Sequence, residues 1–188
     1  MIHVYDDFIK DRDLLSAIEK DTSFYYNNGK YYWWDGEEIR SLKHKLINYI
    51  WIENYPADAT YEISGFEYWT GCQSSEIRLG HMNRLPLHKD KDETLYRETG
   101  KIVSPVIGSV YYTHDCTHVE GGDLLIYNKG DDQEPEVVKP VMNRLVIFDA
   151  GKYSHCVDKV TNGLRRSIAI NLWEDIPHSK KSGQLLSE

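Results

Sequence analysis

Two histidines and one aspartate have types and spacing that suit a metal site. His88 and Asp90 lie two residues apart in Leu87-His88-Lys89-Asp90. On an extended segment, side chains two residues apart point to the same face, so this imidazole and this carboxylate can reach one metal ion. The third ligand must come from a distant segment, and His155, just after an apolar strand-like run, is the candidate. Two neutral imidazoles and one carboxylate with open coordination positions favour Fe(II) in oxygen chemistry.

A carboxylate-binding pair is predicted ten residues beyond His155. Asn162-Gly163 is typical of a hairpin turn, after which a strand begins with Arg165-Arg166-Ser167. Arg165 and Ser167 share one face of that strand. A guanidinium fork with a hydroxyl beside it can bind a carboxylate through several hydrogen bonds. The hairpin therefore predicts a carboxylate clamp close to a metal ligand, as a metal-chelated dicarboxylic 2-oxo acid would require.

The elements that must position these residues are helical first and strand-rich afterwards. A strand is expected within 2–9. Helices are expected over 12–20, with Asp11 as N-cap, and over 36–52, with Asp35 as N-cap. Turns rich in Gly, Asn and Asp separate most of the further strands, which are predicted at 59–69, 75–79, 106–113, 122–128, 136–139, 143–149 and 167–174. This order predicts a mainly β sandwich, jelly roll or barrel with N-terminal helices.

Length and charge narrow the class of protein. The 188 residues suit a single domain, with helical support over 1–57, a β core over 58–175 and a C-terminal tail over 176–188. A formal net charge of −8 without a basic run argues against nucleic-acid or anionic-membrane binding. No apolar stretch is long enough to span a membrane, and the acidic N-terminus is unlike a signal peptide. Three cysteines without zinc-site spacing suggest reduced thiols in the cytoplasm.

Taken together, these motifs resemble the iron(II)- and 2-oxoglutarate-dependent dioxygenases, most closely their prolyl 4-hydroxylase-like branch. The resemblance covers about residues 75–174, and the first 70 residues only loosely. Its elements occur in order as His88-Lys89-Asp90, Gly108-Ser109-Val110-Tyr111-Tyr112, Glu120-Gly121-Gly122-Asp123-Leu124, His155 with Arg165 and Ser167, and Asn171-Leu172-Trp173. Collagen-type members have Lys where Arg165 stands, so the chain is more similar to bacterial, viral and oxygen-sensing members.

The resemblance implies a fold, a ligand set and a reaction. The fold would be a double-stranded β-helix, a cupin-like jelly roll of two facing antiparallel sheets. His88, Asp90 and His155 would hold Fe(II), and Arg165 with Ser167 would bind the distal carboxylate of 2-oxoglutarate. A tyrosine hydroxyl often joins that carboxylate in the family; Tyr112 is favoured, but strand parity leaves Tyr111 open. The reaction would consume O2, release succinate and CO2, and use ascorbate as an auxiliary cofactor.

The substrate remains open between two classes. Hydroxylation of a peptidyl residue such as proline comes first, and the same chemistry on a free amino acid or small metabolite is the alternative. A catalytically silent jelly-roll binding module is a third reading, against which the complete ligand set argues. We expect a cytoplasmic protein of a bacterium or a phage-infected cell, and the oligomeric state is not predicted.

Other polar and aromatic groups are further candidates for a functional role. Asp92 is too far along the chain to replace Asp90 as a ligand. Thr113-His114-Asp115-Cys116-Thr117-His118 could mimic a second metal site but is expected to be a solvated hairpin loop. The aromatic cluster of 24–34, around a turn at Asn27-Asn28-Gly29, is either the edge of the core or a wall of the substrate groove. The polar 91–104 segment is a loop or short helix and a candidate lid.

Overall fold

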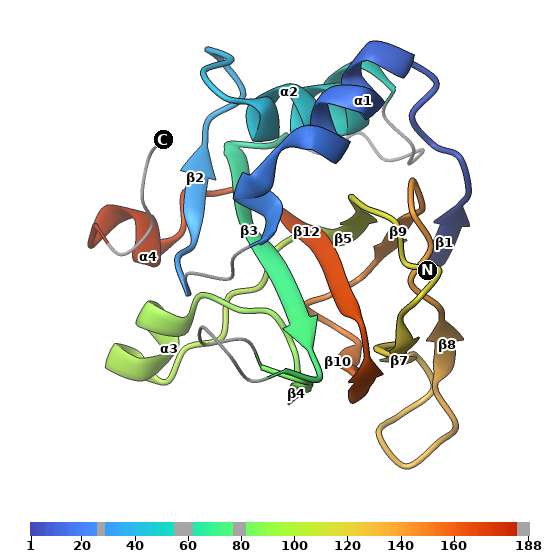
Figure 1. Ribbon diagram of the computed structural model, residues 1–188. Helices are drawn as coiled ribbons and strands as arrows, with labels where there is room; N and C mark the ends of the chain where they lie inside the picture. Colours follow the sequence, from blue (N-terminus) through green and yellow to red (C-terminus); the bar gives the residue numbers. More distant parts are fainter. Residues whose placement is uncertain (26–28, 55–61, 77–81, 184–188) are drawn as a thin grey trace.

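Two antiparallel sheets face each other and form the framework of the protein (Figure 1). The computed structural model describes residues 1–25, 29–54, 62–76 and 82–183. The larger sheet has the order β1-β9-β5-β12-β3-β2, formed by Ile2–Tyr5, Leu145–Phe148, Ile107–Tyr112, Leu164–Trp173, Gly65–Ser74 and Tyr32–Trp34. The smaller has the order β4-β10-β7-β8, formed by Leu85–His88, Ser154–Val157, Leu124–Tyr127 and Glu136–Val138. The strands β11 (Val160–Asn162) and β6 (Glu120–Gly121) pair in a separate two-stranded sheet. The predicted jelly roll is confirmed.

The N-terminal helices cover the outer face of the larger sheet (Figure 1). They are α1 (Arg12–Lys20), the 3-10 turn η1 (Thr22–Tyr25), α2 (Leu42–Asn48) and the π-helical turn η2 (Tyr49–Glu53). The Asp11 side chain accepts hydrogen bonds from the first amides of α1, as its position predicts. Two further helices, α3 (Glu93–Thr99) and α4 (His178–Lys181), pack together beside the sheets. Among the described residues, no helix is long and apolar enough to cross a membrane.

Alternation along β12 divides the interior into two parts. Ile168, Ile170 and Leu172 pack against the helices in one apolar cluster. The intervening side chains, including Ala169 and Asn171, line the space between the two sheets. Because successive strand side chains point to opposite faces, one strand supplies both the core and the wall of an internal cavity.

The second helix differs from its prediction at its start. It begins at Leu42, where the Ser41 hydroxyl accepts a hydrogen bond from the His44 amide. Residues 35–41 are not helical, since Gly36 takes a φ of 86°. Ile39, predicted as part of the apolar stripe, is 48% exposed. A serine cap inside the predicted span therefore replaces the expected Asp35 cap.

Two strand predictions differ from the structure. The strand expected at 59–69 begins at Gly65 and continues to Ser74 as β3, whose pairing with β12 runs without interruption. Residues 75–76, predicted as the start of a strand over 75–79, are not part of a strand. Residues 59–61, 77–79 and the predicted turn residues 27–28 lie outside the described residues. The strands β4 and β10, which carry His88 and His155, are too short and polar to stand out by pattern.

Asn143 joins the N-terminal segment to the β core. Its φ of 59° does not fit a strand, so β9 begins at Leu145 and not at residue 143 as predicted. Its buried amide accepts hydrogen bonds from the Ile9 amide at 2.8 Å and the Tyr111 hydroxyl at 3.0 Å. It also donates to the Ile9 carbonyl at 3.1 Å.

We expect Asn143→Gly to lower the free energy of unfolding by about 2–4 kcal/mol, because it leaves these buried groups unpaired. Glycine tolerates the positive φ, so the variant isolates the side chain from backbone strain. Urea denaturation measures the loss. Asn48→Ala, which removes only an exposed contact with Glu53, is the control and should change stability by less than about 0.5 kcal/mol. A loss below about 1 kcal/mol for Asn143→Gly would contradict the expectation.

Candidate active site

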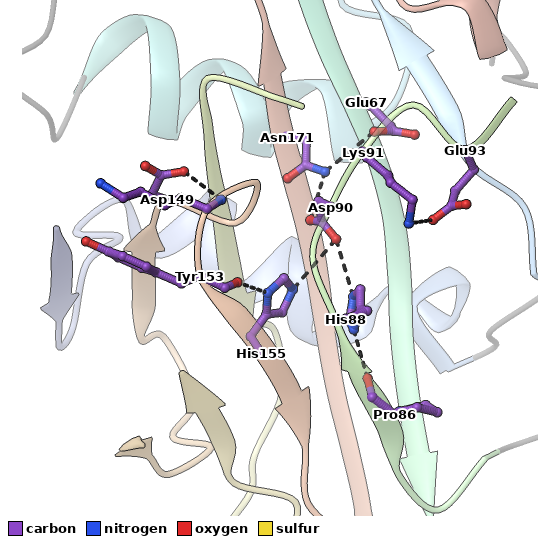
Figure 2. A network of polar contacts seen from close by, with 11 residues as sticks. Glu67, Pro86, His88, Asp90, Lys91, Glu93, Asp149, Tyr153, His155 and Asn171 are labelled. Carbon is purple, nitrogen blue, oxygen red and sulfur yellow. Dashed lines mark hydrogen bonds and ion pairs between the residues drawn. The ribbon is translucent and has the colours of Figure 1, made fainter. Parts of the chain in front are cut away.

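His88, Asp90 and His155 meet at the edge of the smaller sheet (Figure 2). His88 ends β4 and lies directly opposite His155 of β10 in the strand register. Asp90 follows β4, where its amide donates to the Ala150 carbonyl at 2.9 Å. One ligand atom from each of the three side chains lies within 4.8 Å of the others, so the group could hold one metal ion.

Backbone carbonyls orient both imidazoles toward Asp90 (Figure 2). The Nδ1 atom of His88 lies 2.8 Å from the Pro86 carbonyl, and that of His155 lies 3.0 Å from the Tyr153 carbonyl. A carbonyl can only accept, so each Nδ1 carries a proton. In the neutral imidazole Nε2 then presents its lone pair, whereas in the charged form Nε2 donates to Asp90. These Nε2 atoms lie 3.3 Å and 3.6 Å from Asp90 Oδ1. This tautomer is the one that metal-binding histidines adopt.

The charges of the three groups are coupled. Burial alone would raise the pKa of Asp90, but the hydrogen bond with His88 and the charge of His155 outweigh it and lower that pKa. Burial also opposes the charged form of His88, yet the Asp90 carboxylate outweighs it and raises the pKa of His88. Burial lowers the pKa of His155. An ionised carboxylate beside a neutral imidazole is the protonation state from which metal ligands bind.

Asn171 links Asp90 to a second carboxyl group, Glu67 (Figure 2). The Asn171 amide donates to Asp90 Oδ2 at 3.0 Å and lies 3.5 Å from Glu67 Oε2. The Trp173 indole donates to the same Glu67 oxygen at 3.1 Å. Burial, followed by the negative charge of Asp90, raises the pKa of Glu67 to about 8. Asn171 therefore holds the unshared oxygen of Asp90 in place.

Arg165 lies deep in the cavity that the triad borders. The cavity has a volume of about 200 Å³, and Arg165 and Ser167 both line it. The guanidinium is 2% exposed and donates to the Gly122 carbonyl, Gln73 Oε1 and Ser167 Oγ at 2.9, 2.7 and 3.0 Å. It pairs with no carboxylate among the residues that the structure describes. A buried cation without a counter-ion favours the binding of an anion in this cavity.

The two adjacent tyrosines of β5 point to opposite faces of the sheet, and so do the two adjacent arginines of β12. Tyr112 is fully buried, with its hydroxyl 3.3 Å from Arg165 Nη2 and its ring 4.9 Å from the guanidinium carbon. Tyr111 points to the other side, where its hydroxyl donates to Asn143. Arg166 likewise turns away and stacks on the Tyr25 ring at 4.3 Å. Of the two tyrosines, Tyr112 is the one beside Arg165, although it contacts the guanidinium rather than lining the cavity.

Residues missed by sequence reasoning come mainly from β3. Its register pairs Arg165 with Gln73, Ala169 with Trp69, and Asn171 with Glu67. These side chains lie on the cavity side of the ladder, and all line the inner cavity or the one next to it. Asn171 could have been found, because it is six residues from Arg165 and shares its strand face. Gln73, Trp69 and Glu67 carry no such signal, since their place depends on strand pairing.

The aromatic cluster of 24–34 divides between the core and the wall of a cavity, and its role toward a substrate stays a prediction. Trp33 and Trp34 are buried, at 6% and 3% exposed, and belong to the core. Tyr31 is 45% exposed, and its ring lies 5.1 Å from the Trp69 ring beside the triad. The part of the cluster that borders the cavity is therefore Tyr31, whereas the tryptophans support the sheet.

Two other expectations have different outcomes. The segment with His114, Cys116 and His118 is not uniformly solvated, because His114 and Cys116 are buried, at 4% and 8% exposed. The His114 ring lies 5.0 Å from the Tyr25 ring and 6.0 Å from the Phe24 ring, so it is covered by residues of η1. Asp92 caps α3 and accepts hydrogen bonds from Leu95 and Ser179, which ties α3 to α4. It takes no part in the triad.

The donor set fits the cofactors that the motifs suggest. Two imidazoles and a carboxylate leave coordination positions open for a chelating ligand and O2. The unpaired guanidinium lies in the same cavity, as a ligand with a metal-chelating end and a distal carboxylate requires. A side-chain carbon on Gly71 would meet the Ser167 hydroxyl at 2.8 Å, so glycine keeps the space beside this pair clear.

Comparison with known proteins agrees with this geometry. The fold is similar to that of a Pseudomonas putida prolyl-4-hydroxylase, with a TM-score of 0.61 at 17% identity over 92% of this chain and 84% of that one. It is also similar to a Trichoplax adhaerens prolyl hydroxylase solved with a hypoxia inducible factor peptide fragment, with a TM-score of 0.55 at 13% identity over 92% and 83% of the two chains. No curated protein matches the chain by sequence.

The family follows from a match that includes the triad, Gln73, Arg165, Ser167 and Asn171. Residues 73–173 match the model of the 2OG-Fe(II) oxygenase superfamily. They make up more than half of the 188 residues and contain the triad and Arg165. The protein therefore belongs to the 2OG-Fe(II) oxygenase superfamily and is an enzyme of the dioxygenase type.

Proposed function

We propose that the protein is a 2-oxoglutarate- and O2-dependent hydroxylase that binds Fe(II) through His88, Asp90 and His155. Arg165, Ser167 and Tyr112 are the proposed groups for the distal carboxylate of 2-oxoglutarate. The observation that carries the proposal is the buried Arg165 without a carboxylate partner, in one cavity with a convergent His-Asp-His group. Bound there, Fe(II) and 2-oxoglutarate would allow O2 to act as the oxidant: one oxygen atom would convert a substrate C–H bond into C–OH, and the other would enter succinate as 2-oxoglutarate loses CO2.

The residues of the chain position these groups. Pro86 and Tyr153 carbonyls keep both imidazoles in the ligating tautomer, and Asn171 holds Asp90. Such supporting hydrogen bonds fix the direction of metal ligands. Gln73 and Gly122 hold the guanidinium of Arg165 and leave one of its Nη2 protons for a ligand. Burial strengthens that charge-assisted contact.

The proposed substrate is a peptidyl residue such as proline. A second cavity of about 260 Å³ adjoins the triad and is bordered by Tyr31 and Trp69. Rigid aromatic rings beside a reaction centre suit the binding of a peptide side chain. The alternative, a free amino acid or small metabolite, is supported by the small size and mixed polar lining of this cavity, which includes Lys91 and Glu93.

An anaerobic titration tests the cofactor part of the proposal. Adding Fe(II) and then 2-oxoglutarate is expected to produce a visible charge-transfer absorption band, and chelation of the iron by EDTA should remove it. The same protein should then release succinate in air when it is given its substrate. A panel of proline-containing peptides and free amino acids distinguishes the two substrate classes. A folded protein that gives no band would refute the assignment of the site.

A further inference from the structure

The cavity next to the triad contains a carboxyl group that the proposed iron and 2-oxoglutarate sites do not use. Glu67 lines this outer cavity together with His88 and Asp90, but it does not line the inner cavity that holds Arg165. Its position follows from the strand register, which places Glu67 of β3 opposite Asn171 of β12. Glu67 is thus held on a sheet, beside the triad, at the place where a substrate would lie.

Only one of the two Glu67 oxygens is occupied by the protein. Oε2 accepts from the Trp173 indole and lies near the Asn171 amide. Oε1 has no hydrogen-bond partner among the described residues, and none of their ion pairs involves Glu67. Glu67 is half-buried, and Oε1 is not among the buried polar atoms of the described residues that lack a partner, so this oxygen is open to the cavity. The Oε1 atom therefore favours a ligand that can donate a hydrogen bond to it.

The fold does not require a charge at position 67. The amide oxygen of a glutamine could accept both hydrogen bonds that Oε2 receives, without the desolvation cost of a carboxylate. A carboxyl group at this position is explained if Oε1 accepts a hydrogen bond from a ligand.

The residues that line the outer cavity indicate which kind of hydrogen-bond donor a ligand would present to Glu67. The Tyr31 and Trp69 rings, 5.1 Å apart, border the same cavity as Glu67. Aromatic faces attract cations. A cation beside Glu67 would also counter the burial and the Asp90 charge that raise the pKa of this carboxyl group, and the ionised form would bind an ammonium or guanidinium through charge-assisted hydrogen bonds. Lys89, Lys91 and Arg97 also border this cavity, so the cavity as a whole is not acidic. Beside the triad, however, an acidic group and two aromatic rings together favour a cationic nitrogen over a neutral amide.

We propose that Glu67 is a specificity-determining residue that receives a cationic nitrogen of the substrate, an ammonium or a guanidinium, beside the metal triad. This proposal rests on the proposed hydroxylase function and specifies its substrate class. The substrate is then a peptidyl residue with a basic side chain, or a residue with a free amino group, and an internal proline, whose nitrogen is a neutral amide, is not the residue that Glu67 would select. Tyr31 and Trp69 provide the aromatic surface for the same group.

Glu67→Gln isolates the charge of this group. The amide oxygen keeps the bonds to Trp173 and Asn171, while an NH2 group replaces the acceptor that faces the cavity. The probes are three pairs of blocked amides: N-acetyl-arginine amide with N-acetyl-citrulline amide, N-acetyl-lysine amide with N-acetyl-norleucine amide, and proline amide with N-acetyl-proline amide. Each pair compares a cation with a neutral relative. Binding to the protein loaded anaerobically with Fe(II) and 2-oxoglutarate is measured by calorimetry.

The wild type should bind the cation of at least one pair about 10- to 100-fold more tightly than its neutral partner, and Glu67→Gln should abolish that preference. Glu93→Gln is the matched control, because Glu93 borders the same cavity but has a side chain that is 67% exposed and paired with Lys91. It should change the preference by less than about threefold. An unchanged preference in Glu67→Gln, an equal effect of Glu93→Gln, or a wild type that favours no cation would overturn the proposal.

The charge-transfer band separates this proposal from the hydroxylase function. We expect the band to form equally in wild type and Glu67→Gln, since Glu67 contacts neither Arg165 nor a proposed metal ligand. A band in the wild type without a cation preference refutes the role of Glu67 alone. A cation preference without a band refutes the cofactor assignment and leaves the Glu67 result standing.

Discussion

Replacing Asp90 by asparagine is expected to reduce Fe(II)-dependent succinate formation by more than about 100-fold. The substitution keeps the shape and the oxygen that accepts from Asn171, but it removes the charge that lies 3.3 Å and 3.6 Å from the two imidazoles. A neutral amide is a weak ligand for a divalent ion, so the charge-transfer band should be lost with the activity. Succinate release and anaerobic absorption measure the two effects.

The fold should persist in this variant. Asp90 follows β4, and the contacts of the sheets do not depend on its charge. The free energy of unfolding of the metal-free protein should therefore change by less than about 1 kcal/mol. Asp158→Ala is the matched control, because it removes an exposed carboxylate only three residues from His155. An Asp90→Asn protein that keeps the band and more than a tenth of the activity, roughly, would refute the assignment of this ligand.

Replacing Arg165 by lysine is expected to raise the apparent KM for 2-oxoglutarate by about 100-fold. Lysine keeps one positive charge but loses the planar fork that bonds to Gly122, Gln73 and Ser167 and faces the cavity. Binding of Fe(II) alone should remain, because Arg165 does not belong to the His-Asp-His group. Steady-state succinate assays and calorimetry with 2-oxoglutarate measure the change.

The adjacent arginine provides the control for this experiment. Arg166 lies on the opposite face of β12 and stacks on Tyr25, so Arg166→Lys should leave the KM for 2-oxoglutarate within about threefold of wild type. If both variants raise this KM alike, the effect reflects damage to the strand. If Arg165→Lys has no effect on the KM, the carboxylate clamp lies elsewhere.

Local signals predicted several elements well. The α1 helix begins where Asp11 can cap it, because capping involves only atoms within one turn of the chain. The α2 helix shows the limit of such signals. Asp35 and Ser41 are both residue types that cap helices. The positive φ of Gly36 and the exposure of Ile39 exclude the earlier start, and both are known only from the folded structure. Sequence periodicity alone could not decide between the two starts.

The candidate site was predictable where it depends on neighbouring residues. His88 with Asp90, and Arg165 with Ser167, are pairs two residues apart, and each pair is within reach of one point. Their roles in binding Fe(II) and 2-oxoglutarate stay predictions that the variants above test. The choice between Tyr111 and Tyr112 was open, because both lie in one strand and only the packing of its two faces distinguishes them.

The sequence by itself therefore indicated which residues could hold a metal and a carboxylate, which of them share a strand face, and the jelly-roll fold. Only the tertiary structure decided that β10 lies beside β4, which brings His155 opposite His88. It also decided the register of β3 against β12, which adds Gln73, Trp69 and Glu67 to the cavities. Alternation of side chains is a property of a single strand, whereas register depends on hydrogen bonds between distant segments. A shift of one residue would turn every one of these side chains to the other face.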